Sequence, residues 1–222
     1  MNKDTIVFDI ETQNFFTDKG VGWNNFEALK ISVLALYSYN QDKYFCFEEK
    51  ELEKAYNYFL NSKHLVGFSI NRYDIPVLNI YFQKMNFKNP INLWEKERID
   101  LLEEIEKIYG ERISLSKLSE VNLGEKKLRH GSEAGELFLS GQIEELKNYC
   151  LKDVELTKKI YDLYLNNKKL IFPDKKTGQN FILDFENKII IRPGLFSWWV
   201  YKLVFVLNFG VTQKPSLNFP PS

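Results

Sequence analysis

The feature that most constrains this chain is an apolar run near its start, residues 6–12 (IVFDIET), that contains two carboxylates. The run is typical of a buried β-strand, yet Asp9 and Glu11 are among the side chains least suited to burial. Because side chains alternate along a strand, both acids share one face and stand about 6.6 Å apart. They are either strand-end acids that point to solvent or oxygen ligands that converge on divalent cations.

Composition places the chain among ordinary globular proteins. Of 222 residues, 44% are hydrophobic and 27% are charged, which excludes disordered and collagen-like classes and allows one domain with a sizeable core. Lys+Arg and Asp+Glu balance at 30 each, so no overall basic charge marks a nucleic-acid binder, although a local basic edge can accompany an acidic site. The two cysteines form no zinc pattern and no signal peptide precedes the first strand, so we expect a cytoplasmic protein.

The hydrophobic pattern predicts an α/β fold, with a mixed β-sheet flanked by α-helices. Strands are expected over residues 4–12, 30–40, 41–49 and 64–70. Helices are expected over residues 49–62, 74–85, 99–109, 114–121, 131–139 and 141–167. Residues 13–29 are expected to form a long loop.

We divide the chain into three parts. Residues 1–168 would form the main domain, and residues 169–194 a small β-hairpin extension. Residues 195–222 form an apolar segment with a Pro-rich tail. Its apolar run is short for a membrane span and contains Lys202 and Asn208, so we do not expect a membrane protein; an interfacial helix, a buried terminal element and a disordered end all remain open.

A further acid stands in the long helix expected over residues 141–167. From Ile143 to Tyr164, residues at alternating spacings of three and four form the core-facing stripe of an amphipathic helix. Asp153 lies in the middle of this stripe, and Tyr149 lies one turn earlier on the same side. A buried acid in such a stripe needs either a Lys or Arg partner or a metal ion.

Asp74 lies at a strand-to-helix junction within residues 66–78 (VGFSINRYDIPVL). Asp is a favoured N-cap and Pro76 fits the first turn, so an N-cap is the simplest interpretation, and it is compatible with metal binding. Asp100 is interpreted as a helix-start residue and His130 as a loop residue, since exposed polar residues are the ordinary case.

Taken in order, FDIET, GFSINRYD and YCLKD resemble the three motifs of the DEDD superfamily of 3′–5′ exonucleases, which have a ribonuclease H-like fold. The spacing from Tyr149 to Asp153 is similar to the tyrosine subtype, DEDDy. The opening motif is similar to the proofreading domains of family B DNA polymerases, whereas the region from Arg98 is closer to small stand-alone ribonuclease H-like proteins of prokaryotes. The resemblance covers residues 4–167.

The resemblance implies a two-metal phosphodiesterase that removes nucleoside monophosphates from the 3′ end of single-stranded DNA or RNA, with Mg²⁺ or Mn²⁺ as cofactors. It implies that Asp9 bridges both ions, while Glu11 and Asp153 bind the ion on the nucleophile side. Asp74 would hold the ion on the leaving-group side, through water. Tyr149 would orient the attacking water, because a Tyr with a pKa near 10 is a poor base.

Four residues beside the motifs are expected to contact the substrate: Thr12, Trp23, Tyr73 and Asn71. Tyr73 would stack on the terminal base, unless it is a core aromatic, and Trp23 would flank the scissile nucleotide. Ser69 departs from the family pattern, since many relatives carry Asn at this position. A small basic cluster either contacts phosphates or forms a solvated loop. This cluster comprises Lys126, Lys127, Arg129 and His130.

Two other functions are compatible with the same fold. The chain could be an accessory or nucleic-acid-binding module with little activity, recruited to a helicase or polymerase. It could also be a structure-specific nuclease that cleaves internally. The complete set of acids favours the active exonuclease.

Overall fold

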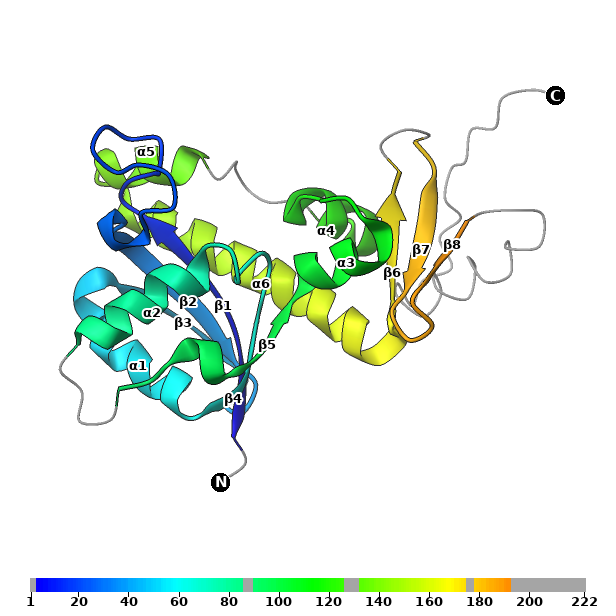
Figure 1. The fold of residues 1–222 in the computed structure, drawn as a ribbon, viewed down its shortest axis with the longest axis horizontal. Helices are drawn as coiled ribbons and strands as arrows, with labels where there is room; N and C mark the ends of the chain where they lie inside the picture. Colours follow the sequence, from blue (N-terminus) through cyan, green and yellow to red (C-terminus); the bar gives the residue numbers. More distant parts are fainter. Residues whose placement is uncertain (1–2, 86–89, 126–131, 175–177, 193–222) are drawn as a thin grey trace.

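A five-stranded mixed sheet positions the acid-bearing strand at its centre (Figure 1). The computed structural model describes residues 3–85, 90–125, 132–174 and 178–192. The strands of this sheet are β1 (Asp4–Thr12), β2 (Ile31–Ser38), β3 (Lys43–Glu48), β4 (Ser62–Gly67) and β5 (Glu97–Asp100). The strands lie in the order β3-β2-β1-β4-β5. The pairs β1–β2 and β2–β3 are antiparallel, and the pairs β1–β4 and β4–β5 are parallel. The predicted α/β class with a mixed sheet is confirmed.

Helices cover both faces of this sheet. The α-helices are α1 (Leu52–Leu60), α2 (Asp74–Lys84), α3 (Leu101–Tyr109), α4 (Leu115–Leu123), α5 (Ser132–Leu139) and α6 (Ile143–Asn167). Short 3₁₀ helices are η1 (Phe26–Ala28), η2 (Glu49–Glu51) and η3 (Leu93–Glu95). Because α1 and α2 pack on one face and α6 crosses the other, the central strand is enclosed between two apolar layers.

The alternation of β1 divides its side chains between two cores. Ile6, Phe8 and Ile10 belong to the core that includes α1 and α2, and each is at most 4% exposed. Val7 belongs to the core that includes α6 and is fully buried. The face expected to carry the acids is therefore the face that α6 covers, as the period of two requires.

The long helix α6 connects the first sheet to a second one (Figure 1). This second sheet is antiparallel and consists of β6 (Lys169–Pro173), β7 (Asn180–Asp184) and β8 (Ile189–Ile191), in that order. Leu170, Phe172 and Leu183 share one core with α3, α4 and α6. Short strands were expected in this part of the chain, and the three strands of the second sheet contribute to the same core as the main domain.

Two expectations about local structure are wrong. Residues 97–100 form β5, where a helix was expected to begin at residue 99, because these residues pair in parallel with β4. The strand expected over 64–70 ends at Gly67, where the chain turns toward α2. The basic cluster (residues 126–130) and the tail (195–222) lie outside the described residues. Among the described helices, none has both the length and the apolar character needed to cross a bilayer.

Candidate active site

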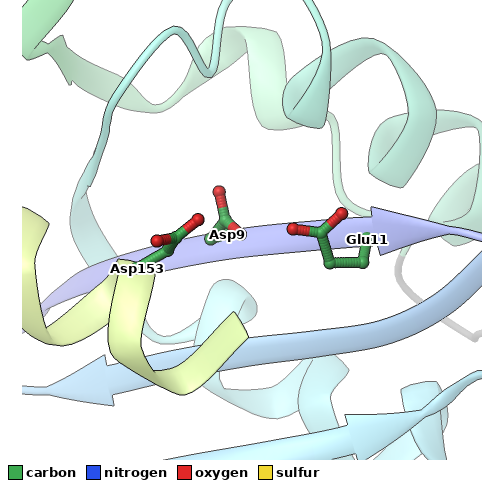
Figure 2. A group of neighbouring side chains, drawn as sticks. All are labelled: Asp9, Glu11 and Asp153. Atoms are coloured by element: carbon green, nitrogen blue, oxygen red, sulfur yellow. The ribbon is translucent and has the colours of Figure 1, made fainter. Parts of the chain in front are cut away.

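Three carboxylates from distant parts of the chain converge at the face of β1 that α6 covers. Asp9 and Glu11 extend from β1, and Asp153 extends from α6 (Figure 2). One oxygen from each side chain lies within 4.8 Å of the others. Asp153 is 2% exposed and the other two are half-buried. The acids of β1 therefore face Asp153, and the alternative in which they simply point to solvent is wrong.

The strand and the helix that carry these acids are joined tightly. On β2, the partners of Asp9 and Glu11 are Ala35 and Val33, which are fully buried. The Sγ atom of Cys150 on α6 lies 3.4 Å from the carbonyl oxygen of Asp9 and 3.5 Å from its Oδ2, within reach of a weak thiol hydrogen bond. The backbone that holds Asp9 is therefore fixed from both sides.

This donor set fits a hard divalent cation. Three like charges in a partly buried site repel one another, and burial weakens their hydration. Carboxylate oxygens are the ligands that Mg²⁺ prefers, and it retains several waters, so a few acids suffice. Asp9, Glu11 and Asp153 can thus hold a divalent cation, which would offset the repulsion.

Tyr149 lies one turn before Asp153 on α6 and is 2% exposed. Burial raises the pKa of its hydroxyl strongly, and the negative charges of Glu11, Asp153 and Asp9 raise it further. The hydroxyl consequently stays protonated at neutral pH and can donate a hydrogen bond beside the carboxylates, but it cannot act as a base.

Asp74 contacts β1 instead of capping its own helix. It is the first residue of α2 and the N-cap is Tyr73, so the N-cap interpretation is wrong. Asp74 is 5% exposed, and its Oδ1 accepts a hydrogen bond of 3.0 Å from the backbone N–H of Ile10, which lies between the two acids of β1. Burial raises the pKa of Asp74, and the negative charge of Asp9 raises it further. A metal-binding role for Asp74 stays a prediction.

The loop that leads into Asp74 is held by Asp100. Asp100 is the N-cap of α3, as expected of a helix-start residue, and accepts hydrogen bonds from the N–H groups of Leu102 and Glu103. It also accepts from the N–H of Ser69 at 2.8 Å and of Asn71 at 3.0 Å. Sequence reasoning identified the cap but missed this second role, which no local pattern signals, because the loop lies about 30 residues earlier.

Ser69, the residue that departs from the family pattern, has a φ of 71°, in the left-handed region that a non-glycine residue adopts at a cost. The Asp100 hydrogen bond stabilises this conformation. The half-buried side chain of Asn71 is held by two hydrogen bonds, since its Nδ2 donates to Glu103 and its Oδ1 accepts from Nε of Arg98. Substrate contact by Asn71 stays a prediction.

Thr12 and Tyr73 are joined next to the carboxylates. The Oγ1 of Thr12 donates to the carbonyl oxygen of Asn14 at 2.8 Å, so the Tyr73 hydroxyl, 2.6 Å away, must be the donor to Oγ1. Burial raises the pKa of Tyr73 to about 12, which keeps this donor protonated. Trp23 lies in the loop after β1 and is 77% exposed. Substrate contact by Thr12, Tyr73 and Trp23 stays a prediction.

The chain is similar to known proteins in family and in fold. Residues 6–165 match the family model RNase_H_2, described as RNase_H superfamily. The structure of the family B DNA polymerase from the hyperthermophilic archaeon Pyrobaculum calidifontis is similar over 73% of this chain, with a TM-score of 0.53 and 15% sequence identity. The similarity spans 24% of that polymerase chain and, at this identity, concerns the fold. No curated protein matches the chain.

Proposed function

This chain belongs to the RNase_H_2 family of the RNase H superfamily, and we propose that it is a metal-dependent 3′–5′ exonuclease of the DEDDy type. Its substrate would be the 3′ end of single-stranded DNA or RNA, and its products nucleoside monophosphates. The observation that carries this proposal is the convergence of Asp9, Glu11 and Asp153 within 4.8 Å. The family and the fold support a nuclease, and the order of the three acid motifs supports the exonuclease type.

Each acid has a distinct place around the proposed reaction centre. Asp9, Glu11 and Asp153 would hold the divalent cations, Mg²⁺ or Mn²⁺, with Glu11 and Asp153 on the nucleophile side and Asp9 serving both sides. Asp74, beside Asp9, would hold the leaving-group side through water. When bound, the cations would lower the pKa of the attacking water and neutralise charge on the scissile phosphate and the departing 3′-oxygen.

Other residues of the site would position the reacting groups. Tyr149, which stays protonated because of its burial and the surrounding carboxylates, would donate a hydrogen bond that orients the attacking water. Cys150 and the central location of β1 fix the backbone of Asp9, so the reacting groups meet with little rearrangement.

The proposal is tested with linear oligonucleotides labelled at the 5′ or the 3′ end, incubated with Mg²⁺ or Mn²⁺. A 3′–5′ exonuclease shortens 5′-labelled strands stepwise and releases the 3′ label as a mononucleotide. We expect Asp9→Ala to abolish this release and Asp162→Asn, a control on the outer part of α6, to preserve it. Equal activity of the wild type and Asp9→Ala would overturn the proposal.

A circular single-stranded substrate distinguishes the exonuclease hypothesis from the hypothesis of a nuclease that cleaves internally. An obligate exonuclease leaves the circle intact, whereas an internal nuclease linearises it. Oligonucleotide binding without hydrolysis would instead support the accessory module, with a helicase or polymerase as its partner.

A further inference from the structure

The loop between β1 and η1, which directly follows the acid-bearing strand, presents a tryptophan to solvent. Trp23 is 77% exposed, although one face of its indole stacks on Phe16, with ring centroids 6.2 Å apart and an interplanar angle of 29°. Because one face of the indole stacks on Phe16 and the side chain is 77% exposed, the opposite face of the ring is open to solvent. A tryptophan offers a large apolar area with a polar edge, and such residues are enriched where a protein binds a partner.

We propose that Trp23, supported by Phe16, is a stacking platform for an unpaired nucleobase of the strand whose 3′ end enters the carboxylate site. The inference rests on the proposed function for its ligand class. The proposed function does not say which group of the chain recognises the single strand outside the reaction centre. We assign this role to Trp23.

Two ring contacts and a hydrogen bond connect this platform to Thr12, the last residue of the strand that carries Asp9 and Glu11. Phe16 meets Tyr73 edge to face, with centroids 5.8 Å apart at 84°. The Tyr73 hydroxyl donates to Thr12, which follows Glu11 in sequence. Only two ring contacts therefore separate Trp23 from Tyr73, which directly precedes Asp74.

The conformation of this loop exposes the side chain of Trp23 to solvent. Trp23 lies between Gly22 and Asn24, which have φ values of 81° and 62°, so the backbone bends on both sides of it. The amide nitrogen of Asn25 donates to the carbonyl of Gly22, and its side-chain Nδ2 donates to the carbonyl of Val21. Val21 is itself anchored in the core that includes α2. A base would thus meet a preorganised ring, which lowers the entropic cost of binding.

The chemistry of the platform selects single strands. Stacking on an aromatic ring requires an unpaired base, and it tolerates any sequence because every base has a π-face. The other described tryptophan offers a contrast: Trp94 is 44% exposed, but the guanidinium of Arg98 covers its ring at 5.0 Å from the centroid. Trp94 therefore serves as a matched control.

The test is equilibrium binding of a 5′-fluorescein-labelled deoxyoligonucleotide, followed by anisotropy in EDTA so that no hydrolysis occurs. We expect Trp23→Ala to weaken binding about tenfold, the order that loss of one base–aromatic stack produces. Trp23→Phe should recover most of the affinity, and Trp94→Ala should leave it unchanged. Since Trp23 is exposed, all variants should have wild-type circular dichroism spectra.

Abasic spacers, introduced one at a time from the 3′ end, identify the stacked base. At one position the spacer should weaken binding to the wild type but not to Trp23→Ala, because a pair in contact shows coupled rather than additive losses. Additive losses at every position, or wild-type affinity of Trp23→Ala, would overturn the inference, as would a wild type that binds no single strand. The proposed exonuclease fails separately, if strands bind in a Trp23-dependent way but are not hydrolysed.

Discussion

Replacing Asp153 by Asn should make the metal-free protein more stable, although most buried substitutions do the opposite. Asn keeps the shape of the side chain and a carbonyl oxygen that can accept hydrogen bonds, but it removes the charge. Asp153 lies within 4.8 Å of both Asp9 and Glu11. Two unit charges about 4 Å apart interact by about 1 kcal/mol in water and about 4 kcal/mol near a protein surface. Because Asp9 and Glu11 are half-buried, water screens both repulsions and the lower figure applies. Removing the two repulsions, about 2 kcal/mol together, should raise the melting temperature by about 4–8 °C, at about 2–4 °C per kcal/mol for a chain of this size.

The order of stability should reverse when a divalent cation is added. A ligand present at 100 times its dissociation constant stabilises the native state by about 2.7 kcal/mol. The wild type has the full carboxylate set and should gain this amount, whereas Asp153→Asn lacks one charged ligand and should gain much less. We therefore expect the variant to melt above the wild type in EDTA, and the wild type to melt above the variant in excess Mg²⁺ or Mn²⁺.

Thermal melts followed by circular dichroism, in EDTA and along a Mg²⁺ titration, measure both effects. Asp162→Asn is the matched control on the same helix, because Asp162 pairs with Lys158 and accepts from Tyr39 instead of facing the carboxylates. The control should lose a little stability and keep the full metal-induced shift. The reasoning is refuted if Asp153→Asn melts below the wild type in EDTA, or if both proteins respond equally to the cation.

Two further substitutions test the supports of the site. Asp100→Ala removes the N-cap of α3 and the acceptor for the N–H groups of Ser69 and Asn71, so urea unfolding should show a loss of about 2 kcal/mol or more, and nuclease activity should fall with it. Gly135→Ala within α5 would normally stabilise a helix by about 0.5–1 kcal/mol. Here the new Cβ would stand 2.5 Å from the ring of Phe15, so we expect lower thermal stability instead, and an increase in melting temperature would contradict the packing.

The parts of the site that sequence reasoning identified are those with a short, regular period. Alternation along β1 placed Asp9 and Glu11 on one face, and the helical stripe placed Asp153 toward the core. Both patterns are local, so they survive folding unchanged. Tyr149 followed from the same helical period.

The parts that sequence reasoning missed depend on contacts between distant segments. Residues 97–100 contain too few apolar side chains to signal a strand, and they become β5 only because β4 provides a parallel neighbour. Asp74 looked like a helix cap because Asp favours that position, but the backbone N–H of Ile10, 64 residues away, is its partner. The stack of Trp23 on Phe16 likewise depends on how the loop folds back on itself.

The central location of β1 has a consequence for the timescale on which the site can relax. β1 pairs with β4 over Asp4–Val7 and with β2 from Ile6 onward, and at the acids the N–H of Ile10 donates to the buried Asp74. The strand also lies between two apolar layers, so its amide protons should exchange slowly with solvent. Local opening of the backbone should therefore be rare at Asp9 and Glu11. The folded chain therefore keeps both carboxylates on the same face of β1, and an arriving cation finds its ligands already in place.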